Sequence, residues 1–508
     1  MGTPITLKTM KADTRDAVID TLAKTWPLNA RQVYSEVRDT QHLNITYQGV
    51  HKVLNQLVKE KIAVTQDRKY ELDASWIKSL RKFAETADKN YSKVENVPYL
   101  EIGTGSSVEK DAFTAGREAA EKAFKQVSKK IKKVQLVLIF ASGNYENDCG
   151  EIIRGTRSIT KGAPLVGGIT CGEINDKRLE KSVTVVIFAA DERLFSAKTT
   201  SIELPKGDSP KTFESALNVL ENKIKIKQKP PDAALIFLPG YSKENGFRIV
   251  ATEFLKEFSN KFSPAFPLGG CLTGEWSFNK TRQFCDDKVY SDNATFVAIY
   301  TKLKMGMRRS QGFEAISNTK YKLKLERETV TKMARIQNGV IGKYEPALEV
   351  YAKDSGVTNI DLAILPEIRS LLAQNKTLPI TRVSDSINSY PAVLKKNGIQ
   401  FNNFFETGDI VEISKTTPQN AITATKEAIN EAIKQGGIKQ PKLAIIFSCA
   451  SLLAMLEPYN IDEIERVGKQ ISGIKIAGCY NLAEIGPLST HQANGTVVAL
   501  VFGNELRD

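Results

Sequence analysis

Three copies of one pattern run through this chain. In each copy an apolar strand is followed by a helix-length gap, a glycine turn that ends in glutamate, and a second apolar strand. The first strands are residues 136–141, 233–238 and 443–447, and the closing strands are residues 182–190, 294–301 and 495–502. The turns read GGITCGE at 167–173, GGCLTGE at 269–275 and GCYNLAE at 478–484. Because such a repeat implies related copies of one unit, the pattern predicts an α/β fold with a reused site.

A helix-length segment also recurs within the repeats. Residues 114–126 and 423–435 share the pattern T-A-x-x-E-A-x-x-x-A-x-K-Q, which places small and apolar side chains three and four residues apart. This spacing predicts an amphipathic helix in each copy. Strands that alternate with such helices favour α/β layering.

The glycine turns supply the candidate ligand-binding residues. Glycine lets the backbone approach a ligand closely, and exposed N–H groups in such turns can hold a carboxylate. The candidates are Gly167, Gly168, Thr170, Glu173, Gly269, Gly270, Thr273, Glu275, Cys449, Tyr480, Asn481 and Glu484. Each turn glutamate has two interpretations: it meets a ligand amine, or it ties the turn to a neighbouring strand.

Composition indicates an ordinary soluble protein. The chain has 508 residues, of which 41% are hydrophobic and 25% charged, enough for about three domains. Because it has no apolar run of about 20 residues and no signal-peptide core, we expect a cytoplasmic protein without membrane contact. The net charge of +13 favours polyanionic partners, but the basic runs at 129–133, 302–309 and 320–327 are interpreted as solvated faces.

The cysteine pattern argues against a metal site and against catalysis. The six cysteines, at 149, 171, 271, 285, 449 and 479, form no CxxC pair, which predicts reduced thiols. A thiol nucleophile is an alternative, but it needs a group that lowers its pKa, and the chain has only three histidines. Walker, dinucleotide-binding and HExxH motifs are absent from the sequence. We therefore expect a protein that is not an enzyme and has neither a metal nor a cofactor.

The first 75 residues differ from the repeats. They predict helices at 14–25, from Asn29, and after Thr46, followed by a hairpin of residues 62–66 and 70–72. The third helix places valines and leucines on one face and polar side chains on the other. This order resembles the winged-helix DNA-binding domains of small prokaryotic repressors.

The winged-helix resemblance implies contacts with double-stranded DNA. The third helix would enter the major groove and the hairpin would touch the phosphate backbone. The candidate DNA contacts are Tyr47, Gln48, His51, Lys52, Asn55, Arg68 and Lys69. A protein-interaction module is the alternative. A helix over 73–94, with an apolar stripe from Trp76 to Ala87, packs on its own domain or forms a homodimer contact.

From residue 99 onward the chain resembles FIST proteins, which are intracellular sensory modules. The resemblance is carried by IGTGSS at 102–107, PLVGGITCGEI from Pro164, PLGGCLTGE from Pro267, the segment 330–351, FSCAS at 447–451 and IAGCYNLAEIGP at 476–487. Two departures are Ser451, where arginine is common, and Ala483, where glycine is expected. The family implies binding of a small metabolite, such as an amino acid, coupled to an attached output domain.

Together these features predict a winged helix-turn-helix followed by repeated α/β FIST units. The expected domains are a winged helix at 1–75, a linker helix at 76–95, a FIST N-terminal domain at 96–328, a central segment at 329–407 and a FIST C-terminal unit at 408–508. The leading hypothesis is a one-component transcription regulator that senses a metabolite. The alternative is a signalling adaptor whose winged helix binds a protein.

Overall fold

The computed structural model divides into two compact units, Met1–Val97 and Pro98–Asp508, which are described separately. The structure describes residues 14–41, 45–95, 99–127, 133–204, 210–224, 230–240, 251–262, 267–274, 276, 279–357, 368–374, 377–401, 405–471, 473–487 and 494–507. Within these residues, every helix is too short or too polar to cross a lipid bilayer.

The N-terminal unit contains the helices and the hairpin that the sequence predicts. Its elements are α1 (Thr14–Lys24), β1 (Leu28–Asn29), α2 (Ala30–Gln41), α3 (Tyr47–Lys59), β2 (Ala63–Gln66), β3 (Lys69–Leu72) and α4 (Ala74–Glu95). Thr46 caps α3, since its hydroxyl accepts a hydrogen bond from the backbone N–H of Gly49 at 3.1 Å. The strands form an antiparallel sheet in the order β1-β3-β2. One core joins the three helices and the sheet.

Two features project from this unit. Asp67 and Arg68 both have positive φ, 50° and 58°, which makes the β2–β3 connection a tight two-residue turn and leaves the Arg68 side chain exposed. In α4 only the start of the predicted apolar stripe packs on the core, through Trp76 and Ile77. Farther along the helix, Phe83 is 60% exposed.

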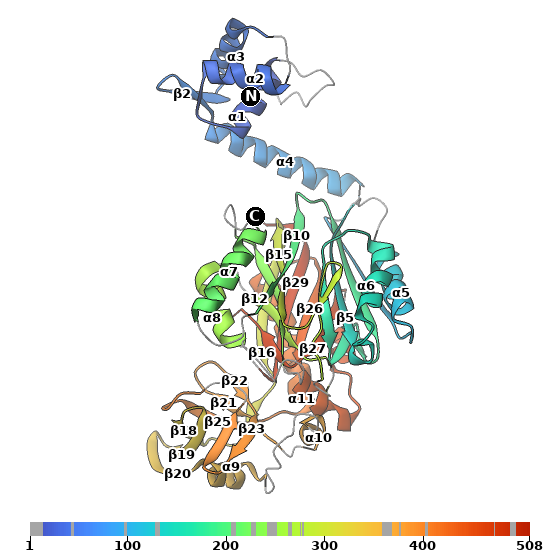
Figure 1. Cartoon of the computed structure of the whole chain (residues 1–508), viewed down its shortest axis with the longest axis vertical. Coiled ribbons are helices and arrows are strands. Elements are labelled where there is room, and N and C mark those ends of the chain that lie inside the picture. The colour runs from blue at the N-terminus through green and yellow to red at the C-terminus, as the bar shows by residue number, and fades with distance from the viewer. Residues whose placement is uncertain are drawn as a thin grey trace. The chain divides into compact units, whose positions relative to one another are not determined.

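The larger unit contains three copies of one α/β arrangement (Figure 1). The first copy is β4 (Leu100–Ser107), α5 (Ala112–Phe124), β5 (Val134–Ser142), η1 (Gly143–Tyr145), α6 (Cys149–Thr160), β6 (Leu165–Thr170), β7 (Gly172–Asn175), β8 (Arg178–Leu179) and β9 (Val183–Ala190). The second is β10 (Phe195–Glu203), α7 (Pro210–Ile224), β11 (Ala233–Pro239), α8 (Ala251–Phe262), β12 (Pro267–Leu272), β13 (Gln283–Cys285), β14 (Lys288–Tyr290) and β15 (Asn293–Thr301). The third is β16 (Leu303–Gln311), α11 (Pro418–Gln435), β26 (Pro441–Cys449), α12 (Ala450–Leu456), η4 (Glu457–Tyr459), α13 (Glu463–Gln470), β27 (Lys475–Asn481), β28 (Ala483–Ile485) and β29 (Thr496–Leu506).

The third copy is split by an insertion between β16 and α11. The insertion comprises β17 (Glu314–Ala315), β18 (Lys320–Glu326), β19 (Thr329–Gln337), β20 (Val340–Pro346), α9 (Ala347–Ser355), α10 (Ile368–Ala373), β21 (Ile380–Arg382), β22 (Ile387–Ser389), β23 (Pro391–Lys395), β24 (Gly398–Phe401) and β25 (Ile410–Lys415). Its strands form a nine-stranded sheet with its own core. Although the insertion separates β16 from α11 in the chain, β16 pairs with β29 and belongs to the sheet of the third copy.

The three sheets share one strand order and exchange strands in a closed ring. Each contains the order β4-β9-β5-β6, β10-β15-β11-β12 or β16-β29-β26-β27, in which the last two strands are parallel. The strand that follows each glycine turn then joins another copy: β7 pairs with β27, β28 with β12, and β13 with β6. Every copy therefore completes the sheet of one neighbour.

The inner faces of the three sheets share one core, in which equivalent phenylalanines meet. The ring centroids of Phe140, Phe237 and Phe447 lie 6.1, 6.3 and 5.8 Å apart in pairs, all in edge-on geometry. The outer face of each sheet is covered by the helices of its own copy. The predicted α/β layering is therefore confirmed, with three sheets around a common centre.

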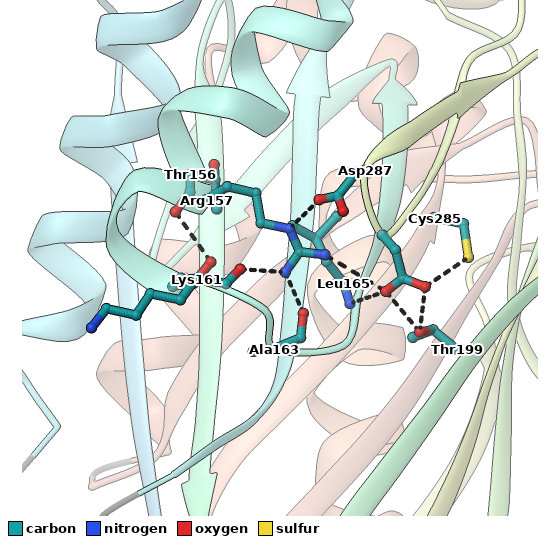
Figure 2. Close-up of polar contacts among 10 residues, drawn as sticks. Thr156, Arg157, Lys161, Ala163, Leu165, Thr199, Cys285 and Asp287 are labelled. Carbon is teal, nitrogen blue, oxygen red and sulfur yellow. Dashed lines mark hydrogen bonds and ion pairs between the residues drawn. The ribbon is translucent and has the colours of Figure 1, made fainter.

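A partly buried arginine, Arg157, links the second copy to the first (Figure 2). Arg157, at the end of α6, donates through Nε to Asp287 Oδ1 at 2.7 Å, and its Nη2 lies 3.6 Å from Asp286 Oδ1. Asp286 also accepts hydrogen bonds from the backbone N–H of Leu165 at 3.2 Å and from the Thr199 hydroxyl at 2.9 Å. The acidic turn between β13 and β14 is thus held in the first copy.

Candidate ligand-binding site

The first glycine of each turn is required by contact with the neighbouring strand. Gly167, Gly269 and Gly478 have φ values of 153°, 142° and 152°. A Cβ at these positions would lie 1.7, 2.0 and 1.9 Å from a backbone carbonyl oxygen of the parallel strand. These oxygens belong to Ile139, Ile236 and Ile446. The repeated glycine therefore serves strand packing in all three copies.

The second glycine of the first turn and that of the second turn leave space for residues of another copy. A Cβ on Gly168 would lie 2.3 Å from the carbonyl oxygen of Arg282, which directly precedes the crossing strand β13 of the second copy. A Cβ on Gly270 would lie 2.5 Å from Cγ of Asn481 in the third copy. Gly270 thus leaves room for a side chain that sequence analysis assigned to the ligand.

In the first copy, hydroxyl groups donate hydrogen bonds to both carboxyl oxygens of the turn glutamate. Glu173 is fully buried, and its Oε2 accepts hydrogen bonds from Ser142 Oγ and Ser182 Oγ, both at 2.6 Å. Its Oε1 accepts from Thr170 Oγ1 at 2.9 Å. Burial raises the pKa of Glu173 to about 7, and these hydrogen bonds oppose the shift. Glu173 therefore ties the turn to β5 and to the start of β9, which is the structural interpretation of a turn glutamate.

In the third copy, the equivalent glutamate has fewer partners. Cys449 ends β26 as Ser142 ends β5, and Thr496 precedes Val497 as Ser182 precedes Val183. Glu484 is fully buried, and its Oε2 accepts from Thr496 Oγ1 at 3.0 Å. Its Oε1 is buried and meets no hydrogen-bond partner among the described residues. The third copy thus has Cys449 where the first copy has Ser142, and Glu484 lacks the hydroxyl donor that Ser142 supplies to Glu173.

Two residues that sequence analysis missed lie beside Glu484. In the β16–β29 register, Gln311 lies opposite Thr496 and Arg309 opposite Val498. Arg309 donates through Nη2 to the Asp385 carbonyl oxygen at 2.9 Å, but its buried Nη1 has no partner within the part of the chain that the structure describes. Gln311 donates through Nε2 to Asn388 Oδ1 at 3.0 Å, and its buried Oε1 is likewise unpartnered among the described residues.

The position of Arg309 corrects one interpretation. The run 302–309 was interpreted as a solvated face, whereas it enters β16 and places a guanidinium nitrogen out of contact with solvent. Burial lowers the pKa of Arg309, while Asp385 and Glu484 raise it when they are ionised. The sequence holds no local signal for this placement, because an insertion separates β16 from the rest of the third copy, and Arg309 approaches Glu484 only through the pairing of β16 with β29.

Cys449 is buried beside this group. Its Sγ lies 2.9 Å from Ser451 Oγ and 3.8 Å from the Leu482 carbonyl oxygen. Burial raises the pKa of the Cys449 thiol, and Glu484 raises it further when it is ionised. A thiol held in its protonated form is a poor nucleophile.

The other cysteines have similar surroundings. All six carry free thiols, and only Cys171 is not fully buried. Burial raises the pKa of Cys149 and of Cys285 to about 12. Among the described residues, no cluster of three metal-ligating side chains is present.

The remaining candidates are distributed between the copies. Asn481 is 1% exposed, its Oδ1 accepts from Cys479 Sγ at 3.1 Å, and its Nδ2 has no partner among the described residues. Tyr480 points to α13 instead, where its hydroxyl donates to Glu463 Oε1 at 2.5 Å. Thr273 lies 3.4 Å from Cys171, between Oγ1 and Sγ. The second-copy glutamate, Glu275, lies outside the described residues.

The predicted DNA contacts are exposed on α3 and at the hairpin turn of the N-terminal unit. Tyr47, Gln48, His51, Lys52 and Asn55 are all exposed on α3, opposite the buried Val50, Leu54 and Leu57. The Asn55 Nδ2 and His51 Nδ1 atoms lie 3.1 Å apart. Arg68 and Lys69 are exposed at the hairpin turn.

Comparison with known families identifies the repeated region. The FIST N domain model matches residues 135–333, and the FIST C domain model matches residues 347–487. The comparison with curated proteins gave no match.

Similarity to solved structures is weak. A crystal structure of cyanuric acid hydrolase from A. caulinodans is 10% identical, with 40% of this chain and 72% of that chain covered and a TM-score of 0.21. Phosphoribosylformylglycinamidine synthase II from Thermotoga maritima is 11% identical, with 80% and 72% covered and a TM-score of 0.18. These scores support no inference about fold or function. The two family matches together show that the chain belongs to the FIST domain proteins, whose domains are sensory and bind small ligands.

Proposed function

We propose that this protein is a one-component transcription regulator in which the FIST region senses a small metabolite, with amino acids among the candidates, and the N-terminal unit binds double-stranded DNA. In this proposal the protein works as a sensor and not as an enzyme. The ligand acts by changing the affinity of the N-terminal unit for DNA.

The difference between the first and third copies carries the sensing proposal. Hydroxyl groups already satisfy both oxygens of Glu173, so that copy is structural. Glu484 retains a buried oxygen without a partner among the described residues. Buried polar atoms are nearly always hydrogen-bonded in folded proteins, so such an atom favours a polar ligand at the third copy.

The N-terminal unit supports the DNA-binding half of the proposal. Its element order, with a three-stranded sheet and a hairpin after the third helix, resembles a winged helix. An exposed polar helix face, followed in the chain by a hairpin with an exposed basic turn, suits a major-groove contact and a backbone contact. Phe83, exposed on α4, favours a homodimer, which sedimentation equilibrium of the full chain tests.

The DNA-binding proposal is tested by selecting duplexes from a random library and measuring their affinity as salt rises. The double variant Lys52→Ala and Arg68→Ala removes two expected DNA contacts. The plot of log affinity against log salt, which falls as salt rises, should therefore become less steep, with the magnitude of its slope reduced by about 1 to 2. Lys78→Ala, an exposed lysine on α4, is the matched control and should leave the slope unchanged. Equal slopes for the double variant and the control would refute contacts by these residues. If no metabolite tested changes the affinity for the selected duplex, the proposed coupling between metabolite binding and DNA binding is refuted.

The adaptor remains the second candidate, because winged-helix modules also bind proteins. Affinity purification of the full chain with and without nuclease separates the two functions. Partners that disappear after nuclease treatment support DNA binding. Partners that persist, and that depend on the exposed face of α3, support the adaptor.

A further inference from the structure

The buried guanidinium nitrogen of Arg309 lacks an anionic partner among the described residues. Arg309 has no carboxylate within 4.0 Å among the described residues, and its Nη2 is satisfied by a backbone carbonyl group. The nearby Asp385 carboxylate is instead paired with Arg382, with Nε and Oδ1 3.2 Å apart. Arg309 therefore keeps a buried N–H donor and a positive charge that no described carboxylate neutralises at contact distance. Guanidinium groups in such positions prefer carboxylate or phosphate oxygens.

The facing carboxyl group is poorly suited to supply that charge. Glu484 is fully buried, and burial raises its pKa well above the usual range, which favours the neutral form. A protonated Glu484 can donate a hydrogen bond as well as accept one. Gln311 Oε1, across from Thr496, is an additional unpartnered acceptor among the described residues. One cationic donor thus lies near two neutral polar groups.

We infer that the third copy binds a small molecule through a carboxylate group, with Arg309 as its principal partner and Glu484 and Gln311 as hydrogen-bonding neighbours. The inference deepens the proposed sensing function, and it names a site and a chemical class of ligand. A phosphate group is a weaker candidate, because the single positive charge of Arg309, which acts on Glu484, matches the one negative charge of a carboxylate.

Matched pairs of probes test the charge requirement directly. Acetate, pyruvate, benzoate and glycine are each compared with the corresponding carboxamide, by isothermal titration calorimetry on the full chain without DNA. At least one carboxylate should bind at millimolar concentration or below, and at least tenfold more tightly than its carboxamide. Because DNA is absent, a failure of the DNA coupling leaves this result unaffected.

Two variants of Arg309 and two control variants show whether the preference for carboxylate over carboxamide depends on Arg309. Arg309→Gln should abolish the preference for the carboxylate, and Arg309→Lys should retain part of it. Glu173→Gln, the equivalent glutamate of the first copy, and Arg308→Gln, the exposed neighbour, should leave it unchanged. The inference is overturned if no carboxylate of the panel binds, if the carboxamides bind equally well, or if Arg309→Gln binds as the wild type does. Circular dichroism checks whether each variant is folded. If a variant does not fold, the comparison of carboxylate with carboxamide on the wild type still tests the inference.

Discussion

Replacement of Glu173 by glutamine should make the FIST region more stable at alkaline pH and change it little in acid. Glu173 is fully buried, and its pKa is about 7 because burial penalises the ionised form. The folded protein therefore holds this proton more tightly than the unfolded chain does. The resulting stability is complete below pH 4.5, is lost as pH rises through about 7, and is absent above that value.

The magnitude follows from the same values. The difference between a pKa of about 7 and the ordinary 4.5 corresponds to about 3 kcal/mol, at about 1.4 kcal/mol for each pKa unit. Glutamine keeps the shape of the side chain and cannot ionise. Its amide can donate to the hydroxyl oxygens of Ser142 or Ser182, since hydroxyl groups rotate to accept. Glu173→Gln should thus gain about 3 kcal/mol over the wild type at alkaline pH and be within about 1 kcal/mol of it in acid.

Urea unfolding measures this difference. In a background with Trp26→Phe and Trp76→Phe, the remaining tryptophan is Trp276, so fluorescence reports on the FIST region. Unfolding free energies at about pH 5 and about pH 8.5 should show a smaller decrease for Glu173→Gln than for the wild type. Glu463→Gln is a second case, because burial also raises the pKa of Glu463 to about 7. An unchanged pH dependence in Glu173→Gln would refute the assignment of a buried, readily protonated carboxyl group.

Two further predictions concern the assembly of the repeats. Gly478→Ala places a Cβ 1.9 Å from the Ile446 carbonyl oxygen and should destabilise the FIST region by about 4 kcal/mol or more, whereas Gly468→Ala, on α13 with 3.9 Å to the nearest atom, should be neutral or slightly stabilising. Urea unfolding of the two variants checks this, and equal stability would contradict the packing role of the turn glycine. Arg157→Gln should cost about 2 kcal/mol, because it removes contacts of a side chain that is only 14% exposed, while Arg193→Gln breaks an exposed pair and should cost under about 0.5 kcal/mol. Equal losses in thermal unfolding would show that Arg157 does not hold the copies together.

Sequence periodicity was sufficient to predict the local elements. The strand, turn and strand pattern of each copy, the amphipathic helices α5 and α11 and the helices of the N-terminal unit follow from local side-chain spacing and capping, as at Thr46. Glu173, Thr170 and Asn481 were selected because glycine turns and polar side chains recur at fixed spacing. The serine partners of Glu173, Ser142 and Ser182, could have been found by aligning the copies, since Cys449 and Thr496 hold the equivalent positions.

The sequence by itself determined the number of copies, the family and the position of each glycine turn, because these depend on neighbours along the chain. Only the tertiary structure decided that β7, β13 and β28 each cross to another copy, since strand pairing between distant segments leaves no local pattern. The hydroxyl groups around Glu173 come from its own copy, whereas the pairing of β16 with β29 brings Arg309 near Glu484 across the insertion. The two turn glutamates therefore have different environments, because Cys449 stands where Ser142 donates in the first copy and because strand pairing brings Arg309, which is distant in the sequence, near Glu484.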